Sequence, residues 1–234
     1  MRPLLAICGV ADGLGRAQAG LFADAGYDVL GLARSDRAAE SVRSDVEAAG
    51  GRYAHEVCDL GRAEEARAAL EPHRDRVEVV IHNAHLLQVA PFLETGADRF
   101  EAVWRAGCLS AVHVAEAVLP VMTARGSGAV LFTGATAGLR GGARFAAFAS
   151  AKFALRGLCQ SLAREFGPQG VHVAHIAIDG LIAAPQTDAR FGAAAEPGVR
   201  LSPCAVAQSY LQLVRQSPSA WTHELDLRPS VERF

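Results

Sequence analysis

Tyrosine is scarce in this sequence: Tyr27, Tyr53 and Tyr210 are the three that occur, and none lies between residues 54 and 209. An excess of one charge is also missing, because 23 Lys and Arg residues balance 25 Asp and Glu residues without a basic block. Nucleic acids and anionic membranes bind to such blocks, so neither is an expected partner. No apolar run approaches the roughly 18 residues that cross a bilayer, and residues 4–9 lead into a glycine turn, not a signal-peptide cleavage site. We therefore expect a cytoplasmic protein.

Paired cysteines and metal-ligand clusters are missing as well. The five cysteines are widely spaced, odd in number and contain no Cys-x-x-Cys pair, which argues against a disulfide framework or a thiolate metal cage. We interpret them as small buried hydrophobic residues. Two histidine pairs, His82 with His85 and His172 with His175, have a spacing that places side chains on opposite faces of a strand. Carboxylates at ligand spacing are absent, so no metal site is predicted.

The sequence has enough apolar residues for one core. Half of its 234 residues are hydrophobic, and we expect a single α/β domain over residues 1–234. Strands are predicted near 3–9, 27–33, 52–58, 77–82, 128–134, 171–178 and 222–227, and helices near 14–25, 36–49, 62–73, 97–123, 147–166 and 203–215. The alternation predicts right-handed βαβ units, and strands that are apolar on both faces predict helices on both sides. The expected fold is a doubly wound parallel sheet.

Residues 181–203 lack a clear periodicity. They contain Pro, Gly and Ala and follow the predicted strand at 171–178. Loops at the carboxyl ends of parallel strands carry binding residues, so this segment is the predicted substrate lid.

A glycine-rich turn follows the first strand. Gly9 allows a tight turn, Gly13 allows a pyrophosphate to approach the backbone, and Gly15 allows the helix that begins near Leu14 to pack on the strand. The position of this turn between a strand and a helix favours a dinucleotide site over a purely structural turn.

The second predicted strand ends in Arg34 and Ser35, without the acidic residue that would accept a bond from the adenosine ribose of NAD. A guanidinium group suits a 2′-phosphate, so NADP is favoured over NAD, and Arg16 can add a second positive charge. The alternative is that both arginines are ordinary solvated residues.

Residues 145–155 read Phe-Ala-Ala-Phe-Ala-Ser-Ala-Lys-Phe-Ala-Leu. This segment resembles the Tyr-x-x-x-Lys helix of the short-chain dehydrogenase/reductase family, with Phe148 in place of the tyrosine and Lys152 as the lysine. Further matches, which run from the glycine turn to about residue 180, are Asp59 with Leu60 for adenine, Asn83 with Ala84, and Gly180. The resemblance implies a Rossmann-type fold, a nicotinamide cofactor and a small-molecule substrate. It also implies a homodimer or homotetramer formed through helices 97–123 and 147–166, which both carry a stripe of small apolar residues. The alternative is that these stripes pack on the chain's own sheet.

The resemblance also implies a degraded catalytic centre. The family's serine, thirteen residues before its tyrosine, corresponds to Ala135, and the asparagine of its long helix corresponds to Gly107. Of the four catalytic positions, only Lys152 is retained, and it can still bind the ribose of the cofactor. Without a proton donor or support for an oxyanion, ordinary carbonyl reduction should be crippled.

Four other polar residues near these positions are candidate replacements for the missing proton donor. Thr136, next to Ala135, is expected to point to the other side of the strand, and Thr133 is expected to lie deeper. His85 and Asp179 replace a glycine and a proline of the family pattern at the nicotinamide end, and either can titrate. A solvated loop histidine and a turn-capping aspartate are the alternatives.

Three functions are compatible with this pattern. The first is an atypical NADP(H)-dependent oxidoreductase that transfers hydride to a substrate needing little acid catalysis, such as an iminium or an activated alkene. The second is a redox-neutral cyclase or isomerase that uses Lys152, His85 or Asp179. The third is a catalytically inactive protein that binds a cofactor or a partner. We rank them in this order.

Overall fold

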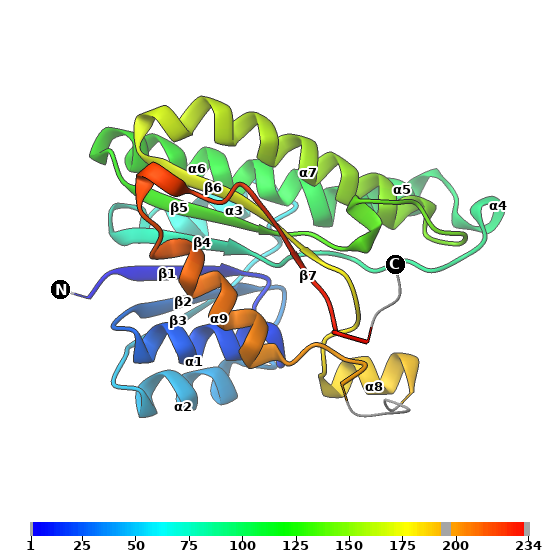
Figure 1. Ribbon diagram of the computed structural model, residues 1–234, viewed down its shortest axis with the longest axis horizontal. Coiled ribbons are helices and arrows are strands. Elements are labelled where there is room, and N and C mark those ends of the chain that lie inside the picture. Colours follow the sequence, from blue (N-terminus) through cyan, green and yellow to red (C-terminus); the bar gives the residue numbers. More distant parts are fainter. Residues whose placement is uncertain (1, 193–197, 232–234) are drawn as a thin grey trace.

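A seven-stranded, all-parallel sheet forms the centre of the protein in a computed structural model that describes residues 2–192 and 198–231 (Figure 1). The strands, in the order that they take across the sheet, are β3 (Tyr53–Val57), β2 (Asp28–Ala33), β1 (Leu4–Cys8), β4 (Val77–His82), β5 (Gly128–Thr133), β6 (Val171–Ile178) and β7 (Glu224–Leu227). All seven predicted strands are confirmed to within two residues. The order reverses direction next to β1, which is the point where doubly wound sheets bind ligands.

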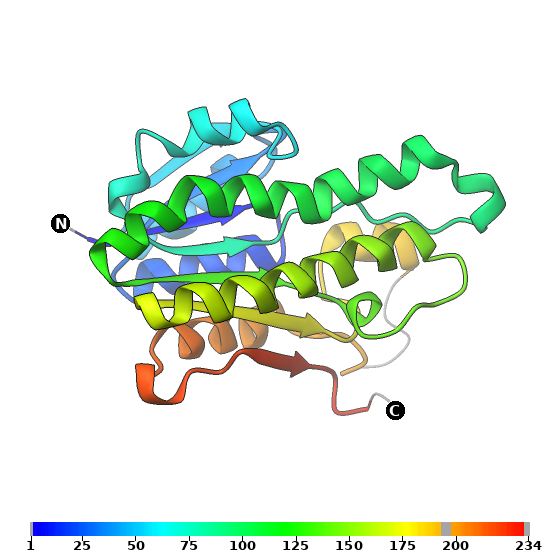
Figure 2. The same cartoon turned by 90° about the horizontal axis from the view of Figure 1, so that it is seen from above.

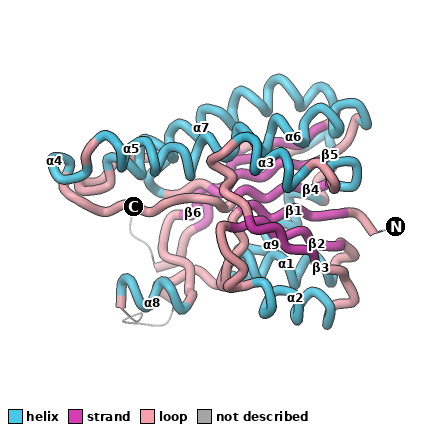
Figure 3. Tube along the Cα trace, turned by 180° about the vertical axis from the view of Figure 1, so that it is seen from behind, coloured by secondary structure: helices cyan, strands magenta, loops and turns pink. Residues whose placement is uncertain are grey.

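Helices cover both faces of the sheet, as Figures 2 and 3 show. One face carries α3 (Ala63–Leu70), α6 (Ser110–Arg125) and α7 (Ala146–Phe166), and the other carries α1 (Leu14–Asp24), α2 (Ala39–Ala48) and α9 (Pro203–Val214). Short helices are α4 (Phe92–Thr95) and α8 (Pro185–Phe191), and α5 (Ala97–Trp104) precedes α6. Short 3-10 turns are η1 (Arg74–Arg76), η3 (Thr136–Gly138), η4 (Gly167–Gln169) and η5 (Pro218–Ala220).

The central strands are apolar on both faces because both faces are covered. Every residue of β1 and of β6 is buried, including the side chains that alternate between the two layers of helices. Two apolar cores result, one on each side of the sheet. Burial of a large apolar side chain contributes about 1.5–3 kcal/mol, so these strands form the stable frame that positions the loops at their carboxyl ends.

Helices α5 and α6 form one continuous helical run, as predicted for residues 97–123, with a π-helical turn η2 at Arg105–Leu109 between them. By length and composition alone the run Ala97–Arg125 could also cross a membrane, but half of its most apolar window is buried inside the fold. The small residues of its predicted contact stripe, such as Ala111 and Ala115, face the chain's own core. Phe153 of α7 is 45% exposed. A subunit contact through these helices stays a prediction.

Two features differ from the expected pattern. Residues 185–191, predicted as part of an irregular lid, form α8, and Ile182 pairs with Leu201 in an isolated parallel bridge. Residues 193–197 of the predicted lid lie outside the described residues. Four cysteines are buried as expected, whereas Cys204 is exposed at the start of α9.

Candidate functional site

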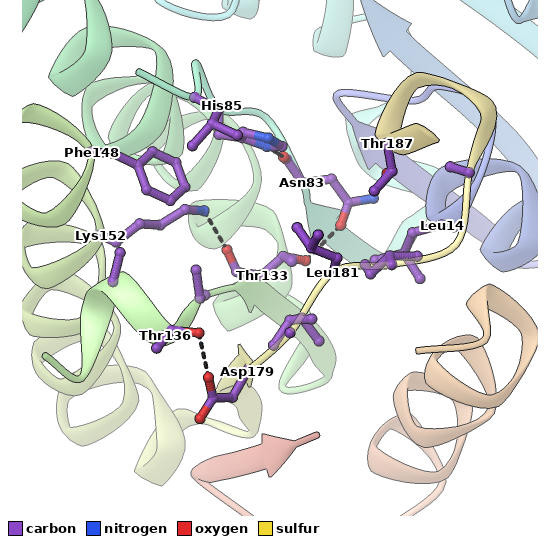
Figure 4. A pocket seen from close by; sticks show the side chains of 18 of the residues that line it. Leu14, Asn83, His85, Thr133, Thr136, Phe148, Lys152, Asp179, Leu181 and Thr187 are labelled. Carbon is purple, nitrogen blue, oxygen red and sulfur yellow. Dashed lines mark hydrogen bonds between the residues drawn. The ribbon is translucent and has the colours of Figure 1, made fainter. Parts of the chain in front are cut away.

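A cavity of about 860 Å³ lies at the carboxyl ends of β1, β4, β5 and β6 (Figure 4). The glycine turn after β1 forms one end of it, and the first turns of α7 form the other. Helix α8 closes it from the side, because Gln186 Nε2 donates to the Asp12 carbonyl and Arg190 Nη2 donates to the Leu87 carbonyl at 3.1 Å. The predicted lid therefore contacts both the glycine turn and the loop after β4.

The glycine turn fits an anion. Gly9 has a φ of 88°, and a Cβ atom there would lie 2.6 Å from the Ala84 nitrogen. Gly13 has a φ of 97°, and a Cβ atom would lie 2.9 Å from the Ala184 Cβ. Helix α1 begins directly afterwards with no side-chain cap and no acidic residue in its first turn. An uncapped helix N-terminus with glycines beside it leaves backbone amides free to bind phosphate groups.

The predicted ribose-phosphate residues lie outside the lining of this cavity. Arg34 and Ser35 are exposed at the end of β2. Arg16 instead donates two bonds to Asp45 of α2, at 2.6 and 2.9 Å, so its charge is already paired. Asp59 accepts a bond from the Gly61 amide at 2.9 Å. Leu60, predicted to contact adenine, is 4% exposed and packs in the core.

Asn83 is held in a buried polar network. Its Nδ2 donates to Gln18 Oε1 at 2.7 Å, and its Oδ1 accepts from the Thr133 hydroxyl. The Thr133 hydroxyl also lies 2.7 Å from the Tyr210 hydroxyl, which is fully buried. Burial raises the pKa of Tyr210, so this phenol stays neutral. The network fixes the end of β4 against β5, and Asn83 and Thr133 face the cavity.

Lys152 points into the cavity from α7 (Figure 4). Its side chain is 2% exposed, and Nζ donates to the Thr133 carbonyl at 2.7 Å. Burial lowers the pKa of Lys152 to about 8, because the ammonium has lost its water. Nζ lies 5.8 Å from the centre of the Phe148 ring, and Phe148 and Ala135 contribute apolar surface beside it.

Gly107 does not line the cavity, whereas the other three family positions, Ala135, Phe148 and Lys152, do. Gly107 is buried in the π-helical turn η2, where a Cβ atom would lie at ordinary contact distance, 3.5 Å, from the Ala151 Cβ. A side chain therefore fits at this position, and close packing does not require the glycine.

The expectation for Thr136 is wrong. The strand β5 ends at Thr133, and the chain then turns into η3, so strand alternation no longer sets the direction of Thr136. Its hydroxyl donates to Asp179 Oδ1, and both residues line the cavity. Asp179 is 5% exposed, and its Oδ2 lies 3.3 Å from Nη1 of Arg228. A hydroxyl and a carboxylate thus occur in the cavity next to Ala135.

His85 lies on the opposite wall. Its Nδ1 lies 2.9 Å from the Asn83 carbonyl oxygen, and its ring meets the Phe148 ring edge-on with the ring centres 6.0 Å apart. Of the three predicted catalytic residues, Lys152, His85 and Asp179, all line the cavity. The described residues contain no group of three or more His, Cys, Asp or Glu side chains that could hold a metal ion.

Residues 4–190 match the family described as short chain dehydrogenase. The chain belongs to the short-chain dehydrogenase family. A short-chain dehydrogenase from Rhodopseudomonas palustris has a crystal structure that is 37% identical, with a TM-score of 0.83 and coverage of 97% of this chain and 98% of that one. The uncharacterized oxidoreductase YciK of Escherichia coli K12 is 27% identical over 170 residues, which are 70% of this chain and 68% of YciK.

The fold also matches a short-chain dehydrogenase solved with a nucleotide. A metagenomic short-chain oxidoreductase in complex with NADP is 23% identical, with a TM-score of 0.83 and coverage of 98% of each chain. At this identity the match shows the fold alone.

Sequence reasoning missed several residues of the short-chain dehydrogenase site. Gln18 and Tyr210 come from α1 and α9, 65 residues from Asn83 and 77 from Thr133, and no local pattern marks such pairings. Arg140 and Arg190 also line the cavity, and no sequence motif marks them as site residues. Arg140 lies close to the Gly-Gly pair at 141–142, a signal of a turn near the predicted site, while Arg190 lies within the segment predicted as the lid.

Proposed function

We propose that this short-chain dehydrogenase is an NADPH-dependent reductase with a non-standard catalytic centre, whose substrate requires hydride but little acid catalysis. An electron-poor alkene or an iminium has this property. The observation that carries the proposal is the contrast within one cavity, between the uncapped helix and glycine turn at one end and the Phe148 ring beside Lys152 at the other.

The cofactor end suits a dinucleotide. The N-terminus of α1 can bind the pyrophosphate, and Lys152 can bind hydroxyl groups of the nicotinamide ribose. Arg34, exposed at the end of β2, supports NADP over NAD because its guanidinium suits the 2′-phosphate. Bound there, the reduced nucleotide supplies the hydride.

The chemical end lacks the tyrosine and serine hydroxyls of the family pattern, and the Thr136 hydroxyl that lies there already donates to Asp179. Phe148 and Ala135 stand where the family resemblance places a tyrosine and a serine, and neither side chain can donate a proton. General acid catalysis contributes about 10²–10⁴-fold to the rate. A substrate that becomes a delocalised anion or a neutral molecule when it accepts hydride is therefore favoured over a ketone. His85 and Asp179 remain the candidate proton-transfer groups in the cavity.

The test is single-turnover mixing of the purified protein and NADPH with matched electrophiles, namely an enone, a cyclic iminium and the saturated ketone of the same size. We expect loss of reduced-cofactor absorbance with the enone or the iminium and little with the ketone. Oxidation of NADPH by the ketone alone, at a rate that the enone and iminium do not approach, would refute the proposal.

A further inference from the structure

Two exposed arginines from different elements line the cavity. Arg140 follows η3, and Arg190 lies in α8. Arg190 is oriented by its bond to the Leu87 carbonyl at 3.1 Å. Within the part of the chain that the structure describes, neither arginine has a carboxylate within ion-pair distance, although pairs of this kind hold Arg16, Arg156 and Arg200.

The carboxylates of the cavity already have partners. Asp179 accepts the Thr136 hydroxyl and pairs with Arg228. Asp12, at the glycine-turn end, accepts a bond from the Ser41 hydroxyl at 2.9 Å. The positive charge of the two arginines is therefore not offset by an acidic partner within bonding distance. A guanidinium in such a position binds planar anions, a carboxylate above all.

Much of the remaining lining of the cavity is apolar. Large hydrophobic side chains of the lining come from the loop after β4, the start of α7 and the lid, namely Leu86, Leu87, Phe145, Phe148, Leu181 and Phe191. A ligand that satisfies both surfaces has an apolar body and one anionic end.

We propose that the substrate of this site is an apolar carboxylic acid whose carboxylate binds Arg140 and Arg190. The inference rests on the proposed function in placing the substrate in the same cavity. It also selects between the two substrate types, because two cations in the lining of the cavity repel an iminium and attract an unsaturated acid.

The experiment measures binding, so it does not require turnover. Decanoate, decanol and decylamine are titrated into the protein by calorimetry below their aggregation concentrations, with and without saturating NADPH. The same titrations use Arg140→Gln and Arg190→Gln, with Arg67→Gln as the matched control, because Arg67 is exposed on α3 and does not line the cavity. NADPH affinity is measured for every variant.

We expect decanoate to bind at least about 10-fold more tightly than decanol or decylamine, and each cavity variant to weaken decanoate by about 5- to 20-fold, since charge-assisted bonds contribute about 1–2 kcal/mol in partly exposed sites. The control and the decanol affinities should not change.

Equal binding of decanoate and decanol, or of decanoate to wild type and both variants, would overturn the inference. A loss of NADPH affinity in the cavity variants would overturn it too, because the arginines would then serve the cofactor phosphates. Failure of wild type to bind NADPH, with the decanoate preference intact, would instead refute the proposed function.

Discussion

Nζ of Lys152 lies 5.8 Å from the centre of the Phe148 ring, on the same face of α7 and inside the cavity. The ring has no hydroxyl for the ammonium to contact, and Nζ donates to the Thr133 carbonyl instead. Lys152 can therefore bind a ribose, but it has no phenol at its side whose proton it could help to release. This pair is the basis of the proposed function, in which the site binds a cofactor but reduces ketones poorly.

Restoring both hydroxyls should restore ketone reduction. In Phe148→Tyr with Ala135→Ser, a phenol and a serine return beside Lys152, and we expect ketone reduction in single turnovers with NADPH to rise by about 10²–10⁴-fold, the usual contribution of a positioned general acid. Phe148→Leu with Ala135→Ser is the matched control and should show no gain. A double variant that folds and binds NADPH but reduces ketones no faster than wild type would show that the two lost hydroxyls are not what limits the reaction.

Lys152 should lower stability while supporting cofactor binding. Its folded pKa is about 8, compared with 10.5 for the ordinary group. The unfolded chain therefore binds more protons between these values, and stability rises with pH across this window. At pH 7 the charged, buried ammonium is unfavourable, so Lys152→Met should raise the free energy of unfolding by about 1–3 kcal/mol and weaken NADPH binding by about 10- to 100-fold.

Urea unfolding at pH 7 and pH 10, with NADPH titrations, checks both effects. The stability difference between Lys152→Met and wild type should shrink at the higher pH, where the wild-type amine is largely neutral in the folded state. A variant that is less stable than wild type at both pH values would mean that the bond to Thr133 outweighs the cost of burying the charge.

The fold could be predicted from the sequence because short local patterns indicate its strands and helices. Apolar runs placed β4 at its observed residues, Val77–His82, and the glycine turn predicted the start of α1 within one residue. The glycine turn at one end of the cavity follows from such a local motif. The chemical end does not, because strand alternation cannot show that β5 stops at Thr133, and this stop is what turns Thr136 toward Asp179. The ion pair of Arg16 is beyond local patterns for a related reason, since its partner Asp45 lies on another helix.

Arg34 should determine the preference for NADPH. Arg34→Ala removes the exposed guanidinium at the end of β2, and we expect NADPH binding to weaken by about 10- to 100-fold, whereas NADH binding should change by less than about 3-fold because NADH carries no 2′-phosphate. Arg16→Gln is the comparison, and its effect should be smaller because Asp45 already pairs with Arg16. Fluorescence titration with both nucleotides provides the affinities. Equal weakening of NADPH and NADH by Arg34→Ala would contradict the assignment.

Buried histidines should make the protein sensitive to mild acid. His82 is fully buried and His175 is 1% exposed. Burial lowers the pKa of His82 to about 3 and that of His175 to about 4. In the unfolded chain both titrate near 6.5, so below that pH the unfolded state binds protons that the folded state does not. Their contribution to stability is therefore complete above pH 6.5 and is lost as the pH falls toward 4.

Urea unfolding between pH 7.5 and pH 4.5 measures this loss. Each histidine should lower the free energy of unfolding by about 1.4 kcal/mol for every pH unit below 6.5. In His175→Gln the slope of the free energy of unfolding against pH should fall by the equivalent of one proton. This holds whatever the variant's stability at pH 7.5, because the slope counts the protons taken up on unfolding and does not depend on the packing of the glutamine. A slope that is the same in wild type and His175→Gln would mean that His175 takes up its proton while the protein is still folded.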